Sequence, residues 1–182
     1  MNNSFLSTEE LSKLSFKSVG SNVFVSRYAK FYGVEQIIIG NNVRIDDFCI
    51  LSGEIKLGNY IHISAYSALY GKFGIEMEDY SGLSPRCTVF SGTDDFSGNS
   101  LIGPMIEPRF TNVKGKKVKI GKYSQLGCNC VILPGVTISE GVAVGAMSLV
   151  TKDLLAWKIY KGIPAKYFKE RSRRLLESGF FE

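Results

Sequence analysis

Histidine and cysteine, which often act as bases, nucleophiles or metal ligands, are few in this sequence. His62 is the only histidine among 182 residues. Cys128 and Cys130 are spaced one residue too closely for the C-x₂-C pattern of a zinc knuckle, so we expect no metal site. Asp94 and Asp95 stand together in a polar stretch, where a carboxylate could orient an amine and stabilise the positive charge that develops on it.

A six-residue repeat supplies the framework that must position these side chains. A large apolar residue returns at every sixth position within each segment of the repeat, and a slim residue follows four positions later. A repeat this short predicts a β-solenoid. Three hexads make one triangular coil, so residues 17–151 predict an all-β solenoid of about six coils. The large positions are Val19, Val25, Phe31, Ile39, Ile45, Leu51, Leu57, Ile63, Leu69, Met77, Leu83, Val89, Ile120, Leu126, Ile132, Ile138, Val144 and Val150. The slim positions are Val23, Ala29, Val43, Cys49, Ser67, Ser81, Cys87, Ser124, Cys130, Val136 and Ser148.

Two other segments cap and interrupt this repeat. Residues 1–16 are expected to form a short N-terminal capping helix, since Ser7 and Glu10 have the spacing of a capping box. Residues 92–117 break the six-residue spacing with a long loop rich in glycine, proline and lysine. Loops of this length without structure of their own are uncommon unless they have a function, so we expect a functional insertion here.

The C-terminal segment, residues 152–182, is strongly basic. Between residues 152 and 174, eight lysines and arginines face two acidic residues, in a chain of formal net charge +5. The pattern after Pro164 predicts one closing helix over about 165–177. The basic surface is either a solvated helix face or a place where a phosphate-bearing ligand binds. We do not expect nucleic acid, since no known binding motif accompanies the charge.

The expected location follows from what the sequence lacks and from its cysteines. No apolar run approaches the roughly 20 residues of a membrane span, and the first residues lack the pattern of a secretory signal. We therefore expect no membrane partner. Cys49, Cys87 and Cys130 fall on slim inward positions, where a thiol behaves as a small apolar group. Free buried thiols fit a reducing compartment, so we expect a cytoplasmic protein.

The late hexads resemble those of a known family. The stretches 120–136 and 142–153, followed by Gly162-Ile-Pro-Ala-Lys166, are similar to the hexapeptide-repeat acyltransferases. The resemblance implies a left-handed parallel β-helix, a homotrimer and acyl-CoA as cosubstrate. It also implies that backbone groups of late coils hold the pantetheine arm between neighbouring subunits and that basic residues meet the phosphates. The positions implied are Gly127, Gly145, Ala146, Lys152, Pro164 and Lys166.

The residue at position 94 indicates the type of acceptor. In O-acetyltransferases of this family a catalytic histidine stands five residues after the large apolar position at the mouth of the loop, and counting from Val89 that position is Asp94. A hydroxyl of pKa roughly 15 needs a base of nearly neutral pKa, whereas an aspartate carboxyl has a pKa of about 3.9. A primary amine mainly needs to be oriented. We therefore expect N-acylation, with Asp94 and Ser84 as the residues that contact the amine.

This arrangement resembles the N-acyltransferases of nucleotide-linked 4-amino-4,6-dideoxy sugars, including that of the anthrose pathway. The resemblance implies transfer of an acetyl or 3-hydroxybutyryl group to a sugar of the dTDP-4-amino-4,6-dideoxyglucose type. The product would enter a surface polysaccharide or a glycoprotein glycan. Arg109 and Lys114 in the loop are the expected contacts of the nucleotide diphosphate.

Other interpretations remain open. His62 could reach the groove from an adjacent chain and serve a sugar O-acetyltransferase of the same fold. The solenoid could also be a non-enzymatic scaffold, in which Asp94 belongs to a polar turn and Ser84 to an ordinary corner. A zinc-dependent carbonic anhydrase of this architecture would need three histidines per metal, and each chain has one.

Overall fold

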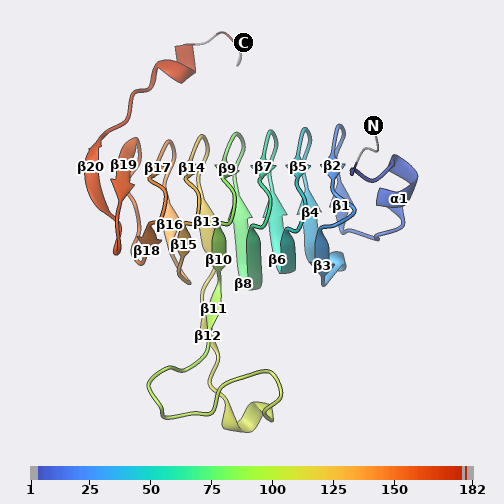
Figure 1. Ribbon diagram of the computed structural model, residues 1–182, viewed down its shortest axis with the longest axis vertical. Helices are drawn as coiled ribbons and strands as arrows, with labels where there is room; N and C mark the ends of the chain where they lie inside the picture. The colour runs from blue at the N-terminus through green and yellow to red at the C-terminus, as the bar shows by residue number, and fades with distance from the viewer. Residues whose placement is uncertain (1–3, 178, 180–182) are drawn as a thin grey trace.

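The computed structural model describes residues 4–177 and 179. The backbone winds as a β-solenoid, in which the strands of each triangular turn pair with those of the turns on either side (Figure 1). Along one face, seven parallel strands follow one another before an antiparallel edge strand. The solenoid therefore has about seven turns, one more than the sequence predicts, because it continues past residue 151 to β19. The hand of the winding stays a prediction.

Each turn contributes strands to three faces, which we call A, B and C. Face A consists of β1 (Ser18–Val19), β4 (Ile37–Ile39), the second halves of β6 (Ile50–Leu57) and β8 (Ala68–Met77), β13 (Val118–Ile120) and β16 (Thr137–Ile138). Face B consists of β2 (Phe24–Val25), β5 (Arg44–Ile45), β7 (His62–Ile63), β9 (Gly82–Leu83), β14 (Gln125–Leu126), β17 (Ala143–Val144), β19 (Lys158–Lys161) and β20 (Lys166–Glu170). Face C consists of β3 (Lys30–Tyr32), the first halves of β6 and β8, β10 (Thr88–Phe90), β15 (Val131–Ile132) and β18 (Leu149–Val150).

The six-residue repeat forms the core of the solenoid. Successive turns are in register, so Ile45, Ile63 and Leu83 lie one above another along face B. The other large positions between residues 25 and 150 are also buried, apart from Phe31, which is half-buried. Val19, in the first turn, is 37% exposed. The stacking of these large apolar side chains fixes which residues of each strand point inward. It therefore also fixes which residues point outward from each face.

Aromatic rings line the corner between faces A and B. Tyr60, Tyr80 and Tyr123 have φ angles of 57°, 59° and 59°, a left-handed conformation that is unfavourable for bulky residues. Their rings stack along the solenoid, with centroids 4.7 Å apart for the first pair and 5.4 Å for the second. Stacking contributes about 1 kcal/mol per pair and so offsets part of the backbone cost.

The N-terminal end of the solenoid is covered by α1 (Thr8–Ser12). The predicted capping box is present: the backbone nitrogen of Glu10 donates to Ser7 Oγ at 3.2 Å, and that of Ser7 donates to Glu10 Oε2 at 2.7 Å. The helix is shorter than the segment 1–16 expected from the sequence, of which the first three residues lie outside the described part. A short helix η1 (Val34–Gln36) follows in the first turn.

The prediction of a closing helix over 165–177 is wrong, because most of this segment is a strand and its connection. β20 pairs antiparallel with β19 and covers the last edge of face B, and a short helix η3 (Arg174–Glu177) follows. A strand satisfies the free backbone groups of β19, which a helix laid on the edge could not do. The side chain of Arg171 then donates to the carbonyl oxygens of Tyr123 and Val142, at 2.7 and 3.2 Å. Residues 178 and 180–182 lie outside the description.

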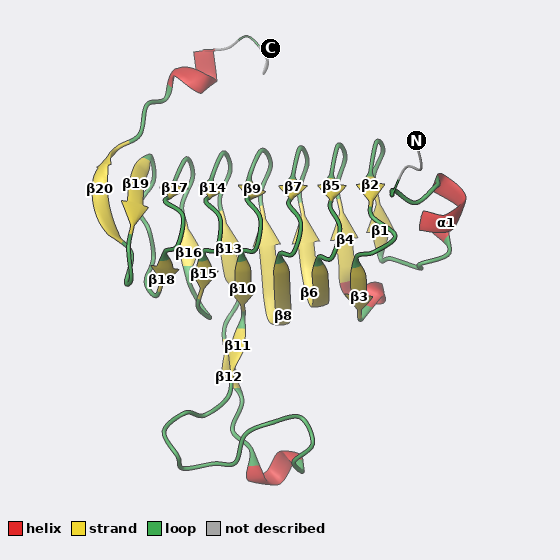
Figure 2. Ribbon diagram, viewed as in Figure 1, coloured by secondary structure: helices red, strands yellow, loops and turns green. Residues whose placement is uncertain are grey.

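The predicted insertion leaves the corner between faces C and A as a stalked loop (Figure 2). Its stalk is a two-stranded antiparallel stem of β11 (Gly92–Thr93) and β12 (Lys114–Gly115). Beyond the stem lies a short helix η2 (Pro108–Phe110). Within the described residues, no helix is long and apolar enough to cross a membrane.

Candidate active site at the stem of the loop

Asp94 lies beside a hollow of about 770 Å³ at the base of the loop. It is the first residue after β11, so the pairing of the stem determines where its backbone lies. Its side chain is half-buried. A hollow of this volume is in the range that takes small ligands and cofactors. The other lining residues are Tyr70, Lys72, Gly92, Thr93, Gly103, Pro104, Ile106, Pro108, Thr111 and Val113.

Lys72 is a residue of this hollow that the sequence analysis missed. It belongs to β8, one turn before the loop, and adds a cationic residue to the lining of the hollow that Asp94 also lines. Tyr70, from the same strand, stacks on Phe90 with ring centroids 5.2 Å apart. One signal was available: Leu69 and Met77 are eight residues apart instead of six, which marks an insertion in the turn next to the loop.

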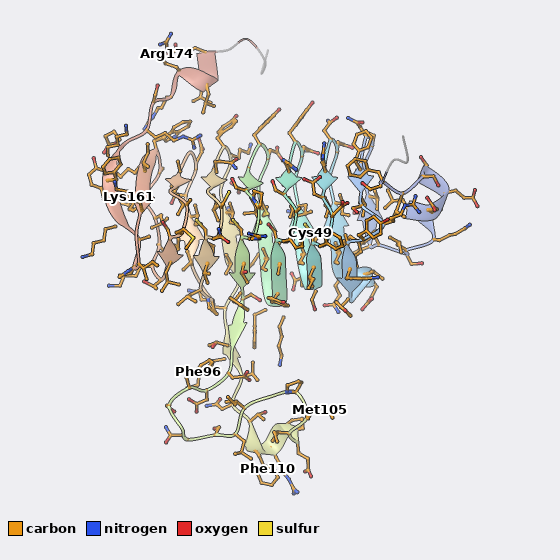
Figure 3. All side chains as sticks on the ribbon, viewed as in Figure 1. Cys49, Phe96, Met105, Phe110, Lys161 and Arg174 are labelled. Atoms are coloured by element: carbon orange, nitrogen blue, oxygen red, sulfur yellow. The ribbon has the colours of Figure 1, made fainter. Side chains whose placement is uncertain are left out.

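Neither loop residue expected to bind a diphosphate lines this hollow. Arg109 Nε lies 2.8 Å from Glu107 Oε2, and its side chain borders another hollow, beside Gly98 and Phe110. Lys114 pairs with Thr93 across the stem and is exposed. Figure 3 shows the labelled side chains Met105 and Phe110 far out on the loop, whereas Phe96 lies nearer the stem. The structure therefore does not bring Arg109 or Lys114 together with Asp94 in the hollow.

Ser84 lies at the corner between faces B and C, before β10, whereas Asp94 follows the far end of that strand. The strand β10 that separates them alone spans about 10 Å at about 3.3 Å per residue, and the chain then bends at Ser91 into the stem. Ser84 Oγ accepts a hydrogen bond from Gln125 Nε2 at 3.4 Å. Within one chain, the structure therefore does not place Ser84 beside Asp94 as the sequence analysis suggested.

His62 lies outside the hollow, on face B. Its Nε2 is 2.7 Å from Asp46 Oδ2, and Arg44 Nε donates to the other oxygen of the same carboxylate at 2.6 Å. Partial burial of Asp46 works to raise its pKa, but hydrogen bonds from Arg44 and His62 outweigh it and lower the pKa. The imidazole is thus engaged with a carboxylate on a face that the Asp94 hollow does not reach.

The two glycines implied in CoA binding lie in successive turns of the solenoid. The backbone nitrogen of Gly127 donates to Val144 at 2.8 Å, and that of Gly145 donates to Tyr160 at 2.8 Å. A Cβ on Gly127 would lie 2.6 Å from the backbone nitrogen of Ala146, so close packing of turns already requires glycine there. Since both amides are used within the solenoid, these glycines can offer a ligand contact surface but no free N–H.

The remaining positions implied for CoA surround the last turn. Lys152, Pro164 and Lys166 are all exposed, and Lys166 begins β20. Two other lysines of the hairpin lie over one ring: the Nζ atoms of Lys161 and Lys169 are 3.6 and 5.7 Å from the centroid of Phe168. The basic excess predicted from the sequence is therefore gathered on the hairpin that closes the solenoid.

The buried cysteines do not line the hollow: Cys49, Cys87 and Cys130 are fully buried inside the solenoid. Burial raises the pKa of the Cys49 thiol to about 11. A hydrogen bond with Cys130, together with burial, raises the pKa of Cys87, and the same hydrogen bond lowers the pKa of Cys130 to about 7 although burial opposes it. The Sγ atoms of Cys87 and Cys130 donate to the carbonyl oxygens of Gly127 and Gly145 at 3.1 and 3.2 Å. Across the described residues, no group of three or more histidine, cysteine, aspartate or glutamate side chains could hold a metal ion.

A hexad-repeat solenoid with one loop and a hollow at its stem is the architecture of an acyltransferase class, and two full-length relatives agree. The chain is 44% identical over 176 residues to the dTDP-4-amino-4,6-dideoxy-D-glucose acyltransferase of Escherichia coli, covering 95% of this chain and 92% of the relative. It is 52% identical to AntD, an N-acyltransferase from Bacillus cereus solved with dTDP and 3-hydroxybutyryl-CoA, with a TM-score of 0.94 over 96% of this chain and 94% of AntD. The chain belongs to the hexapeptide-repeat acyltransferases.

Three further findings complete the comparison. AntD has also been solved with the substitutions D94A, D94N, S84A, S84C and S84T. The acetyltransferase domain of PglB from Neisseria gonorrhoeae shares the fold at 17% identity, with a TM-score of 0.61 over 80% of this chain and 57% of that one. No family model matches the chain.

Proposed function

We propose that the protein transfers a short acyl group from acyl-CoA to the amine of dTDP-4-amino-4,6-dideoxyglucose. The observation that carries this proposal is the carboxylate of Asp94 at a hollow whose lining contains no histidine. The near full-length relation to an acyltransferase named for this sugar, and to AntD, supports it. AntD has been solved with CoA and the amino sugar together, and with 3-hydroxybutyryl-CoA.

The proposed reaction is direct attack of the amine on the thioester. The lone pair of the nitrogen forms a bond to the thioester carbon, the bond from carbon to sulfur breaks, and CoA leaves as a thiolate. The nitrogen gains positive charge during this step, and the carboxylate of Asp94 holds the amine and stabilises that charge. The proton lost from nitrogen passes to the carboxylate or to water and then to the thiolate. No acyl-cysteine is required.

Within the hollow, we assign the contact with the diphosphate to Lys72. Its ammonium is the only lysine or arginine group among the residues that line the hollow. Arg109 is already paired with Glu107, so a diphosphate would have to displace that carboxylate. Lys114 stays a candidate only if the loop changes conformation around the ligand. A contact between an ammonium and a phosphate is charge-assisted and strong when partly shielded from water.

We assign CoA to the surface of the late turns, with Gly127, Gly145 and Ala146 as contact surface for the pantetheine arm. The phosphates would meet the basic end of the solenoid, where Lys152 and Lys166 lie near the closing hairpin. Pro164 would border the same surface. The small side chains at these points let a ligand approach the backbone closely.

We infer that the complete site forms between two chains of a homotrimer. Ser84 and Asp94 lie at opposite ends of β10 in one chain, so a single amine could contact both only if they come from neighbouring chains. In AntD, too, residues 84 and 94 are serine and aspartate, and both have been substituted. Mixing S84A and D94A chains tests this inference: after random assembly of an equimolar mixture, about a quarter of all sites would regain both groups, whereas a site within one chain would regain none.

The experiment that tests the function is a thiol-release assay with acetyl-CoA and 3-hydroxybutyryl-CoA. The acceptors are dTDP-4-amino-4,6-dideoxyglucose and its 4-hydroxy counterpart. We expect turnover of the amine only, and a loss of about 10² to 10⁴-fold in Asp94→Ala. Asp95→Ala is the matched control, because the carboxylate of Asp95 is engaged by Ser97 at 2.6 Å. Turnover of the hydroxyl compound, with loss in His62→Ala, would favour the O-acetyltransferase instead.

A further inference from the structure

β8 differs from β6, the strand one turn earlier, at the corner between faces C and A. Gly53 pairs with Gly71 and Ile55 pairs with Ile75, so residues 72–74 of β8 stand opposite a single residue of β6. This bulge lies next to the corner from which the loop leaves, because β10 pairs with the first half of β8 and β13 with the second. The turn beneath the loop is therefore built differently from the turn before it.

The ring of Phe73, in this bulge, lies against the stem of the loop. Gly92 and Gly115 pair with each other across the stem. A Cβ on Gly92 would come within 2.9 Å of the Phe73 ring, and a Cβ on Gly115 would overlap the ring. Neither glycine has a positive φ, so their conformation does not explain why glycine stands there. The two glycines leave a strip of bare backbone, and the ring packs on it.

Polar contacts join the same bulge to the stem. Ser91, directly before β11, is fully buried. Its Oγ accepts a hydrogen bond from the backbone nitrogen of Phe73 at 2.9 Å and donates to the carbonyl oxygen of Tyr70 at 3.0 Å. Its own carbonyl oxygen accepts from the backbone nitrogen of Lys116, directly after β12, at 2.9 Å. Both strands of the stem are thus tied to one bulge of the solenoid.

We propose that Phe73 is a positioning residue for the reaction: through the pair Gly92 and Gly115 it sets the direction of the stem and so the place of Asp94. The stem has only two residue pairs, and Asp94 is the next residue. Phe96 and Met105, farther out, are 81% and 94% exposed. Since a misplacement of about 1 Å at a reacting group can cost roughly 100-fold in rate, a loosened stem has a large effect. This inference rests on the proposed role of Asp94.

The test removes the contact from either side. In Phe73→Ala the ring is lost, and in Gly115→Ala the new methyl group pushes it away. For both, we expect kcat for the amino sugar to fall about 10 to 100-fold while KM for acyl-CoA stays within about twofold, because CoA is assigned to the late turns. Amide hydrogen exchange should become faster in residues 92–95 and 113–116 and stay unchanged in the strands of the solenoid. Phe73→Tyr keeps a flat ring and should retain both the rate and the protection.

The control is Tyr32→Ala, which removes an exposed ring from β3, two turns away on the same sheet, and should change neither measurement. Normal kcat in Phe73→Ala with faster exchange in the stem would overturn the positioning role. Unchanged exchange in both variants would overturn the contact itself. Failure of the proposed function looks different: the wild-type protein would not acylate the amine, or Asp94→Ala would keep its activity, while the exchange measurement on Phe73→Ala still reports on the stem.

Discussion

The solenoid and the loop of residues 92–117 are organised in opposite ways. In the solenoid each turn repeats the last, and a residue such as Leu69 lies buried between Leu51 and Val89 of the neighbouring turns. In the loop nothing repeats, and the side chain of Met105 is 94% exposed. The solenoid derives its stability from many equivalent contacts between turns, whereas the geometry of the loop depends on a few contacts at its stem. The part that carries Asp94 thus contributes least to stability.

The largest effect on stability is expected in the core of the solenoid. Leu69→Ala removes a fully buried side chain from the middle of the stack and should lower the free energy of unfolding by about 2 to 5 kcal/mol. Phe96→Ala, at an exposed ring of the loop, should change it by less than about 0.5 kcal/mol. Urea unfolding followed by circular dichroism measures both. Equal losses in the two variants would mean that the loop is part of the cooperative core.

A smaller effect is expected at the closing hairpin. Arg171→Met keeps an unbranched side chain but removes the donors to the carbonyl oxygens of Tyr123 and Val142. Leaving these two acceptors without that partner should cost about 1 to 3 kcal/mol. Arg174→Met, at an exposed arginine in the next residues, is the control and should be close to neutral. A thermal melt that does not distinguish Arg171→Met from Arg174→Met would show that the hairpin is not held by this side chain.

The smallest effect on stability is expected at β8, the strand that pairs with β13, where the chain re-enters the solenoid after the loop. Glu76 on β8 accepts from Lys117 Nζ at 2.6 Å and from Lys56 Nζ at 3.0 Å. The hydrogen bond from Lys117, opposed by burial and helped by Lys56, lowers the pKa of Glu76 from its ordinary value of 4.5. A lowered pKa in the folded state stabilises the protein above the unfolded value, and this stabilisation is lost as pH falls below 4.5 toward the folded-state pKa.

Glu76→Gln should therefore be less stable than the wild type at pH 7 by on the order of 1 kcal/mol, and the difference should vanish as the solution is acidified below that range. Unfolding measured at a series of pH values tests this, with the exposed Glu140→Gln as the control. A difference in the free energy of unfolding that grows as the pH falls would contradict the lowered pKa of Glu76. Together with Leu69→Ala and Phe96→Ala, this measurement shows how much of the stability comes from the turns of the solenoid and how much from the loop.

The sequence predicted the repetitive part well, for a physical reason. Each inward position recurs every six residues, so the pattern of Ile120, Leu126 and Ile132 reports burial directly, and all three are buried. It predicted the final turn poorly. There the spacing changes, with Val144 paired to Tyr160, and the edge of face B is covered by a strand in place of the expected helix. The aromatic corners were also missed, because they depend on a backbone conformation that composition does not reveal.

The candidate site likewise has one part that the sequence predicted and one part that it did not. The sequence alone determined the solenoid and the place where its repeat is interrupted, because these follow from the spacing of residues along the chain. The resemblance to the acyltransferases then pointed to the aspartate at that interruption. Only the tertiary structure decided that Lys72 borders the hollow while Arg109 does not, that His62 is held by Asp46 on another face, and that Phe73 packs on the stem. These relations join residues of different turns, and a loop with no repeat of its own takes its direction from the neighbours it packs against.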